Sequence, residues 1–173
     1  HDFGDDKTGE SCSYCNIKNI NYSGISISGV DTPYYYTGNE IKPDITIKKG
    51  ETSLTLGEDY NITYGNNTSV AESNAENAPY VKITGTGNYA GEITKNFTIA
   101  YIAAPDNYIT GTKGANDWYT SDVTIGVADW QVSTDGSSWN DSISVTEEGT
   151  HSYTLYFKDS NGYITDSINK EIK

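Results

Sequence analysis

Apolar side chains recur at every second position in many short stretches of this chain. Such alternation places successive side chains on opposite faces of a β-strand. The stretches are residues 45–47, 54–56, 60–64, 81–83, 97–99, 123–127, 130–132, 143–145 and 153–157, and residues 163–165 and 168–172 are expected to return as the last strands. Turn-forming Gly, Asn and Asp residues separate them. No window has a 3.6-residue period, so the pattern predicts an all-β chain with almost no helix.

The alternating stretches fall into two groups on either side of residues 100–107. This interval contains Pro105 and little polar alternation, as in a short stiff linker. We therefore expect two domains, residues 17–101 and residues 106–173, each a β-sandwich. A β-grasp-like fold is the alternative for the first domain and would need one helix packed on its sheet. Residues 1–16 are polar, carry both cysteines, and are interpreted as a tail or the remnant of a preceding module.

The first half of the chain carries several spaced motifs. They are Tyr36-Thr37-Gly38, Gly57-Glu58-Asp59-Tyr60, Tyr64-Gly65-Asn66-Asn67, Ile83-Thr84-Gly85-Thr86-Gly87-Asn88-Tyr89-Ala90-Gly91 and Phe97-Thr98-Ile99. Together they resemble a β-rich repeat found in tandem in surface and secreted proteins of low-GC Gram-positive bacteria. The resemblance covers residues 25–100. Residues 68–79 depart from it, because the family usually has a shorter, Gly-containing hairpin there.

Three phrases of the second half resemble bacterial Ig-like repeats. They are Trp118-Tyr119-Thr120-Ser121-Asp122-Val123-Thr124, Ser133-Thr134-Asp135-Gly136-Ser137-Ser138-Trp139, and Gly149-Thr150-His151-Ser152-Tyr153 followed by Lys158-Asp159-Ser160-Asn161-Gly162. The resemblance implies two tandem Ig-like β-sandwich domains in an extracellular stalk or adhesive protein. It carries over no catalytic residue, and a fold alone does not fix a function.

Composition narrows the range of partners. The formal net charge is −13, and all 11 basic residues are Lys. A field of this sign repels phosphate backbones and anionic lipid surfaces, so we expect no nucleic-acid partner and no membrane binding. No apolar run approaches the roughly 20 residues of a membrane-spanning helix. The chain contains no Met, which indicates a segment of a longer protein, and we expect it to be monomeric within that longer chain.

Cys12 and Cys15 form a single C-x-x-C pattern, which leaves three alternatives open. The pair could form a disulfide in an oxidising compartment, remain as free thiols, or contribute to a partial zinc site with His1 as a third ligand. Structural zinc requires four ligands, so the chain alone does not complete such a site. No cofactor is expected.

Aromatic residues are the most suggestive candidates for ligand binding. Tyr34 and Tyr35 lie in a run of three tyrosines, so at least one ring must face outward on a strand. Trp118, Trp130 and Trp139 are all found in the second half, and Trp118 and Trp139 are the candidates there. Exposed rings stack on sugars and anchor interfaces. The alternative is that the Trp residues build the core and the Tyr residues cover its flanks.

No motif predicts catalysis. The chain has two His residues and lacks the G-x-S-x-G nucleophile pattern. The sequence therefore predicts a non-catalytic spacer or adhesion module of a larger bacterial cell-surface or secreted protein. Its partners would be cell-wall or host glycans or proteins. A carbohydrate-binding accessory module of a secreted enzyme is the alternative function.

Overall fold

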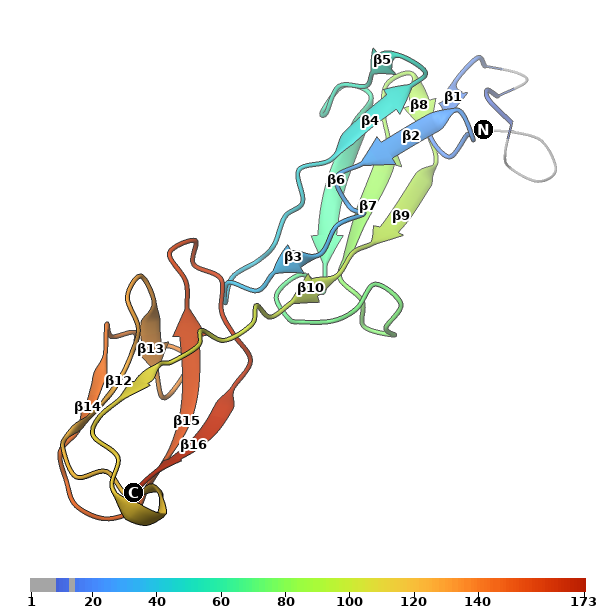
Figure 1. Ribbon diagram of the computed structural model, residues 1–173. Coiled ribbons are helices and arrows are strands. Elements are labelled where there is room, and N and C mark those ends of the chain that lie inside the picture. Colours follow the sequence, from blue (N-terminus) through green and yellow to red (C-terminus); the bar gives the residue numbers. More distant parts are fainter. Residues whose placement is uncertain (1–8, 13–14) are drawn as a thin grey trace. The chain divides into compact units, whose positions relative to one another are not determined.

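The computed structural model describes residues 9–12 and 15–173 (Figure 1). His1, named above as a potential zinc ligand, lies outside the described residues. Nearly all regular structure in the described residues is β-strand, and the exception is a three-residue 3-10 helix, η1 (Ala115–Asp117). The prediction of an all-β chain is therefore confirmed.

The chain divides into two compact units. Unit 1 comprises the described residues up to Tyr34 together with residues 39–100, and unit 2 comprises Tyr35–Gly38 and Tyr101–Lys173. The chain therefore leaves unit 1 after Tyr34, returns at Asn39, and leaves again after Ala100.

Unit 1 contains several small sheets and no helix in its described part, although the β-grasp-like alternative requires one. Strands β2, β4 and β5 form one three-stranded sheet and β6, β7 and β9 form another, while β1 pairs with β8 and β10 pairs with β3. Their bounds are β1 (Lys18–Asn19), β2 (Ile25–Ser28), β3 (Tyr34–Tyr35), β4 (Thr46–Lys49), β5 (Thr52–Ser53), β6 (Tyr60–Gly65), β7 (Tyr80–Gly85), β8 (Tyr89–Ala90), β9 (Glu92–Asn96) and β10 (Ile99–Ala100).

The core of unit 1 is built from inward residues of both three-stranded sheets. Ile47 on β4 and the pair Val81 and Ile83 on β7 are fully buried. The Tyr64 hydroxyl, from β6, donates a hydrogen bond to the carbonyl of Pro43, which precedes β4, at 2.7 Å. The predicted alternation thus places the side chains of Ile47, Val81 and Ile83 on the inner faces of their sheets.

The described residues before β1 are part of unit 1. The Cys12 amide donates to the Ile17 carbonyl at 2.7 Å, and the Asn19 amide donates to the Glu10 carbonyl at 2.8 Å. The Lys49 ammonium pairs with the Glu10 carboxylate. This stretch is thus anchored by backbone hydrogen bonds and an ion pair.

Unit 2 is built from two three-stranded sheets, β11-β12-β14 and β13-β15-β16. Their bounds are β11 (Ile109–Thr110), β12 (Val123–Ile125), β13 (Gln131–Ser133), β14 (Ile143–Val145), β15 (His151–Lys158) and β16 (Ile168–Ile172). Both sheets contribute to one buried cluster, whose members are Val123, Ile125, Val132, Val145, Leu155, Phe157 and Ile172. All of these except Ile172 are alternating residues of the sequence pattern, so the pattern correctly identified most of this core.

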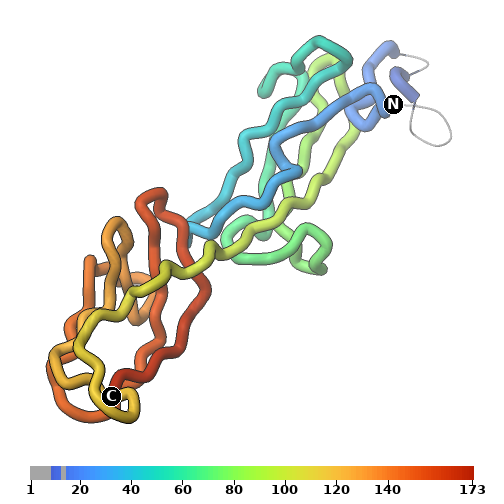
Figure 2. The backbone as a smooth tube through the Cα atoms, in the orientation of Figure 1, coloured from blue at the N-terminus to red at the C-terminus, as the bar shows by residue number. Residues whose placement is uncertain are grey.

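Residues Tyr35–Gly38 belong to unit 2, although they precede most of unit 1 in the sequence. The Ile164 amide donates a hydrogen bond to the Tyr36 carbonyl at 2.8 Å. The ring centroid of Tyr36 lies 5.4 Å from that of Tyr101, and the centroid of Tyr35 lies 5.2 Å from that of Tyr163. The tube in Figure 2 follows the chain path through both units.

The alternation fails at residues 54–56. The pattern predicts that Leu54 and Leu56 both point inward, but Leu54 is 8% exposed and Leu56 is 57% exposed. The strand at this point, β5, ends at Ser53. A turn follows, in which Gly57 has φ of 86° and the Thr55 amide donates to the Asp59 carboxylate. The turn changes the direction of the chain, so the inward face is lost after Leu54.

This difference predicts unequal costs for two identical substitutions. Leu54→Ala removes a buried side chain and should lower the free energy of unfolding by about 2–5 kcal/mol. Leu56→Ala should change it by no more than about 0.5 kcal/mol, because its side chain is mostly in water. Urea denaturation followed by fluorescence measures both. Equal effects of the two variants would contradict the burial described here.

Candidate functional site

The adjacent tyrosines Tyr34 and Tyr35 lie in different environments. Tyr34 is half-buried, with its ring edge-on to Phe97 at 5.6 Å, and its hydroxyl donates to the Gly29 carbonyl. Burial raises the pKa of Tyr34, and the negative charge of Asp44 adds to this shift. Tyr35 is 43% exposed. Tyr34 therefore packs within unit 1, and Tyr35 is the more accessible ring.

The tryptophans of unit 2 also differ in exposure. Trp139 is half-buried, and the Lys158 ammonium lies 4.4 Å from its ring centroid. Trp130 packs against the buried cluster of unit 2. Trp118 is 45% exposed. The structure therefore does not bring the four predicted aromatic candidates together, and Trp118 is the one that borders a cavity.

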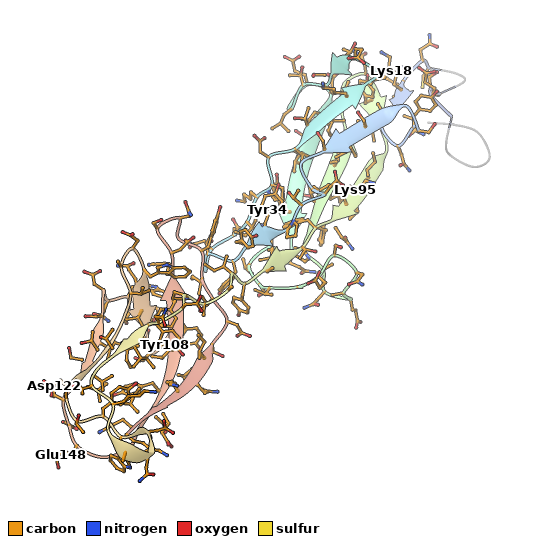
Figure 3. The ribbon with its side chains drawn as sticks, in the orientation of Figure 1. Lys18, Tyr34, Lys95, Tyr108, Asp122 and Glu148 are labelled. Atoms are coloured by element: carbon orange, nitrogen blue, oxygen red, sulfur yellow. The ribbon has the colours of Figure 1, made fainter. Side chains whose placement is uncertain are left out.

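A cavity of about 660 Å³, here called the Trp118 hollow, lies at one end of unit 2. Its lining includes Trp118, Asp122, Glu147, Glu148 and His151. Figure 3 shows Asp122 and Glu148 at this end of the unit. Its volume falls within the range of about 300–1,000 Å³ that is typical of small-ligand sites. The sequence pattern indicated Trp118 but none of the carboxylates. Asp122 follows Trp118 closely without forming a recognisable ligand-binding motif, and Glu147 and Glu148 lie on a loop that is distant in sequence.

The backbone around Trp118 is held firmly. The Gly114 amide donates to the Trp118 carbonyl at 2.7 Å, and the Trp118 amide donates to the Ala115 carbonyl at 3.2 Å. The next amide, that of Tyr119, donates to the Lys173 carbonyl at 2.7 Å. Trp118 therefore presents an exposed ring from a fixed backbone.

His151 lines the Trp118 hollow and is half-buried. Its Nε2 atom lies 3.1 Å from the Glu147 carbonyl oxygen. This contact ties the first residue of β15 to the loop that carries the hollow's glutamates.

A second cavity, of about 590 Å³, lies near the other end of β15. Its lining includes Asp129, Trp130, Asp141, Lys158 and Asp159. The Asp159 carboxylate accepts the amides of Asn161 and Tyr163 and so holds the turn that the sequence predicts there. In the described part of the chain, no group of three or more His, Cys, Asp or Glu side chains is arranged to hold a metal ion.

The two cysteines lie close together in unit 1. Cys12 is buried and Cys15 is exposed. A hydrogen bond with the Cys12 side chain raises the pKa of the Cys15 thiol. Neighbouring thiols fit the disulfide and the free-thiol alternatives, and both of these, like the partial zinc site, stay predictions.

Asp135 has the most strongly perturbed carboxylate among the described residues. Its Oδ1 atom accepts the amides of Ser137 and Ser138 at 2.8 and 2.7 Å, and its Oδ2 atom accepts the Ser138 hydroxyl at 2.8 Å. The buried Ser133 hydroxyl donates to Oδ1 at 2.8 Å. These hydrogen bonds, led by the Ser138 and Ser137 amides, hold the pKa of Asp135 well below its usual range. Asp135 thus fixes the turn after β13.

No helix in the described residues is long and apolar enough to span a membrane. No family model, curated protein or solved structure matches the chain.

The lowered pKa of Asp135 predicts a pH dependence of stability. A carboxyl whose pKa is lower in the folded state stabilises the fold above its unfolded pKa, near 3.9, and loses that contribution as the pH falls below it. Asp135→Asn should therefore be less stable than the parent at neutral pH, and the gap should narrow as the pH falls below about 4. Urea midpoints measured across this range test the prediction.

The matched control is Asp106→Asn, which changes an exposed aspartate of the same unit. It should leave the stability–pH curve of the parent almost unchanged. A constant gap between Asp135→Asn and the parent at every pH would contradict the assigned role of the Asp135 carboxylate.

Proposed function

We propose that this chain is a non-catalytic, load-bearing spacer of a larger bacterial cell-surface or secreted protein. Its two units would act as tandem Ig-like β-sandwiches that carry tension along the chain. One observation carries the proposal: in each unit, a segment near the beginning pairs in parallel with a segment near the end.

In unit 1 the parallel pair is β1 with β8. Lys18 pairs with Tyr89 and Asn19 with Ala90. The Lys18 amide donates to the Asn88 carbonyl at 2.8 Å, and the Ile20 amide donates to the Ala90 carbonyl at 2.9 Å. The first strand of the unit is thereby fastened to the segment that continues through β9 to β10.

In unit 2 the corresponding parallel contact joins Ile102 and Thr165. The Ile102 amide donates to the Ile164 carbonyl at 3.3 Å. Thr165 leads directly into β16, which pairs with β15 from Leu155↔Ile168 to His151↔Ile172. After Thr165 the chain therefore runs along β16, from the Leu155↔Ile168 end of the β15–β16 ladder to its His151↔Ile172 end.

Parallel pairing determines how these hydrogen bonds respond to tension. A pull toward the N-terminus moves the first segment backward along its axis, and a pull toward the C-terminus moves its partner forward. The hydrogen bonds between the two are therefore loaded together, in shear. An antiparallel hairpin pulled at its open end would instead lose its bonds one after another, at lower force.

Two further observations support a surface setting. The motifs quoted above resemble those of tandem repeats in Gram-positive surface proteins. The net charge of −13 favours solubility of an exposed domain. An extracellular location, and glycan or protein partners at the cell wall or on a host, belong to the same proposal.

Single-molecule force spectroscopy on the 173-residue chain tests the proposal that the chain is a load-bearing spacer. Pulling between the termini should give a distinct unfolding event for each unit. Lys18→Pro removes the amide that donates to Asn88 and should lower the rupture force of unit 1 while that of unit 2 stays unchanged.

The control is Lys18→Ala, which keeps this amide and removes the ammonium located 5.4 Å from the Tyr89 ring centroid. It should have a smaller effect on rupture force than Lys18→Pro. A rupture force that is the same in the parent and in Lys18→Pro would refute load-bearing by the β1–β8 pair.

A further inference from the structure

The Trp118 hollow combines an exposed aromatic ring with charged side chains that are mostly acidic. Trp118 keeps 45% of its surface in water although its backbone is fixed by two hydrogen bonds. A large, rigidly presented ring loses little conformational freedom when a ligand covers it. Such rings are favoured anchors in binding sites.

The charged side chains of the hollow are mostly carboxylates. Asp122, Glu147 and Glu148 are exposed, and none forms an ion pair within the described part of the chain. The one lysine in the lining, Lys173, has its ammonium 3.0 Å from the Glu171 carboxylate. The hollow therefore favours a cationic ligand and repels sulfated, phosphorylated or uronic sugars.

The backbone of this segment offers little to an extended peptide. The Tyr119 amide donates to Lys173 and the Thr120 amide donates to Thr112, while the Trp118 carbonyl accepts from Gly114. Peptides that bind by strand addition need such main-chain groups to be free. The groups that remain available to a ligand are the Trp118 indole face and the carboxylate oxygens. These groups suit a ring-shaped ligand that bears amino and hydroxyl groups.

We propose that the Trp118 hollow binds a glycan with free amino groups, such as a polymer of glucosamine. The C–H face of one sugar ring stacks on the Trp118 indole. Ammonium groups of the same or neighbouring sugars pair with the carboxylates of Asp122, Glu147 and Glu148. This activity goes beyond the spacer role and does not depend on it.

Isothermal titration calorimetry of the whole chain with glucosamine oligomers tests the assignment, in low-salt buffer at a pH that keeps the sugar amines protonated. The parent should bind these oligomers. Trp118→Ala should weaken binding about tenfold or more. The double variant Glu147→Gln with Glu148→Gln should also weaken it, and added salt should do the same because the pairs are exposed.

The matched control is Tyr35→Ala, which removes another exposed ring, 43% exposed, that does not line the hollow. It should bind as the parent does. Circular dichroism of each variant checks that the fold is intact.

Three outcomes would overturn the proposal. The first is that the parent does not bind glucosamine oligomers. The second is that the parent binds N-acetylglucosamine oligomers as tightly as glucosamine oligomers. The third is that Trp118→Ala binds glucosamine oligomers as tightly as the parent does. A lysine oligopeptide that binds as tightly, and with the same dependence on Trp118, would assign the hollow to basic peptides instead. None of these results bears on the spacer proposal, whose test is the rupture force of unit 1.

Discussion

Parallel hydrogen bonds between distant segments close each unit of this chain. In unit 1 the amides of Lys18 and Ile20 bond to the carbonyls of Asn88 and Ala90, across about 70 residues of intervening sequence. Closing so long a loop costs entropy that only the burial of a core can offset. The fully buried side chains of Ile20, Val81 and Ile83 in the same unit supply that burial. Terminal pairing and core formation should therefore be cooperative.

The sequence predicted the features that depend on local alternation, and it did not predict where the strands end. Alternation marks which residues share a face, and it correctly identified Val123, Ile125, Leu155 and Phe157 as core residues of unit 2. It carries no information on where a strand ends, so it placed Leu56 inside although the turn at Gly57 turns this side chain outward. Strand periodicity is a local property, and turn geometry overrides it within one residue.

The hydrophobic pattern could not predict which segments, distant in sequence, belong to the same unit. Nothing in the spacing of Tyr35–Gly38 indicates that the Tyr36 carbonyl accepts the Ile164 amide of unit 2. The Trp118 hollow presents the same difficulty. The sequence identifies an aromatic residue near turns, but the carboxylates of Glu147 and Glu148 reach the hollow only because β12 pairs with β14. Candidate residues can therefore be selected from sequence by type, whereas their grouping depends on the sheet topology.

The position of the hollow makes spacing and ligand binding compatible in one unit. The Ile102–Thr165 contact lies beyond the Leu155↔Ile168 end of the β15–β16 ladder, whereas His151 and Ile172, which line the hollow, form the opposite end. A ligand on Trp118 would therefore leave the hydrogen bond between Ile102 and Ile164 untouched. The buried cluster between the two ends, which includes Leu155 and Phe157, separates the hollow from the Ile102–Ile164 hydrogen bond. A rigid β-unit can thus keep the parallel contact of the proposed spacer at one end and present a preorganised aromatic ring at the other.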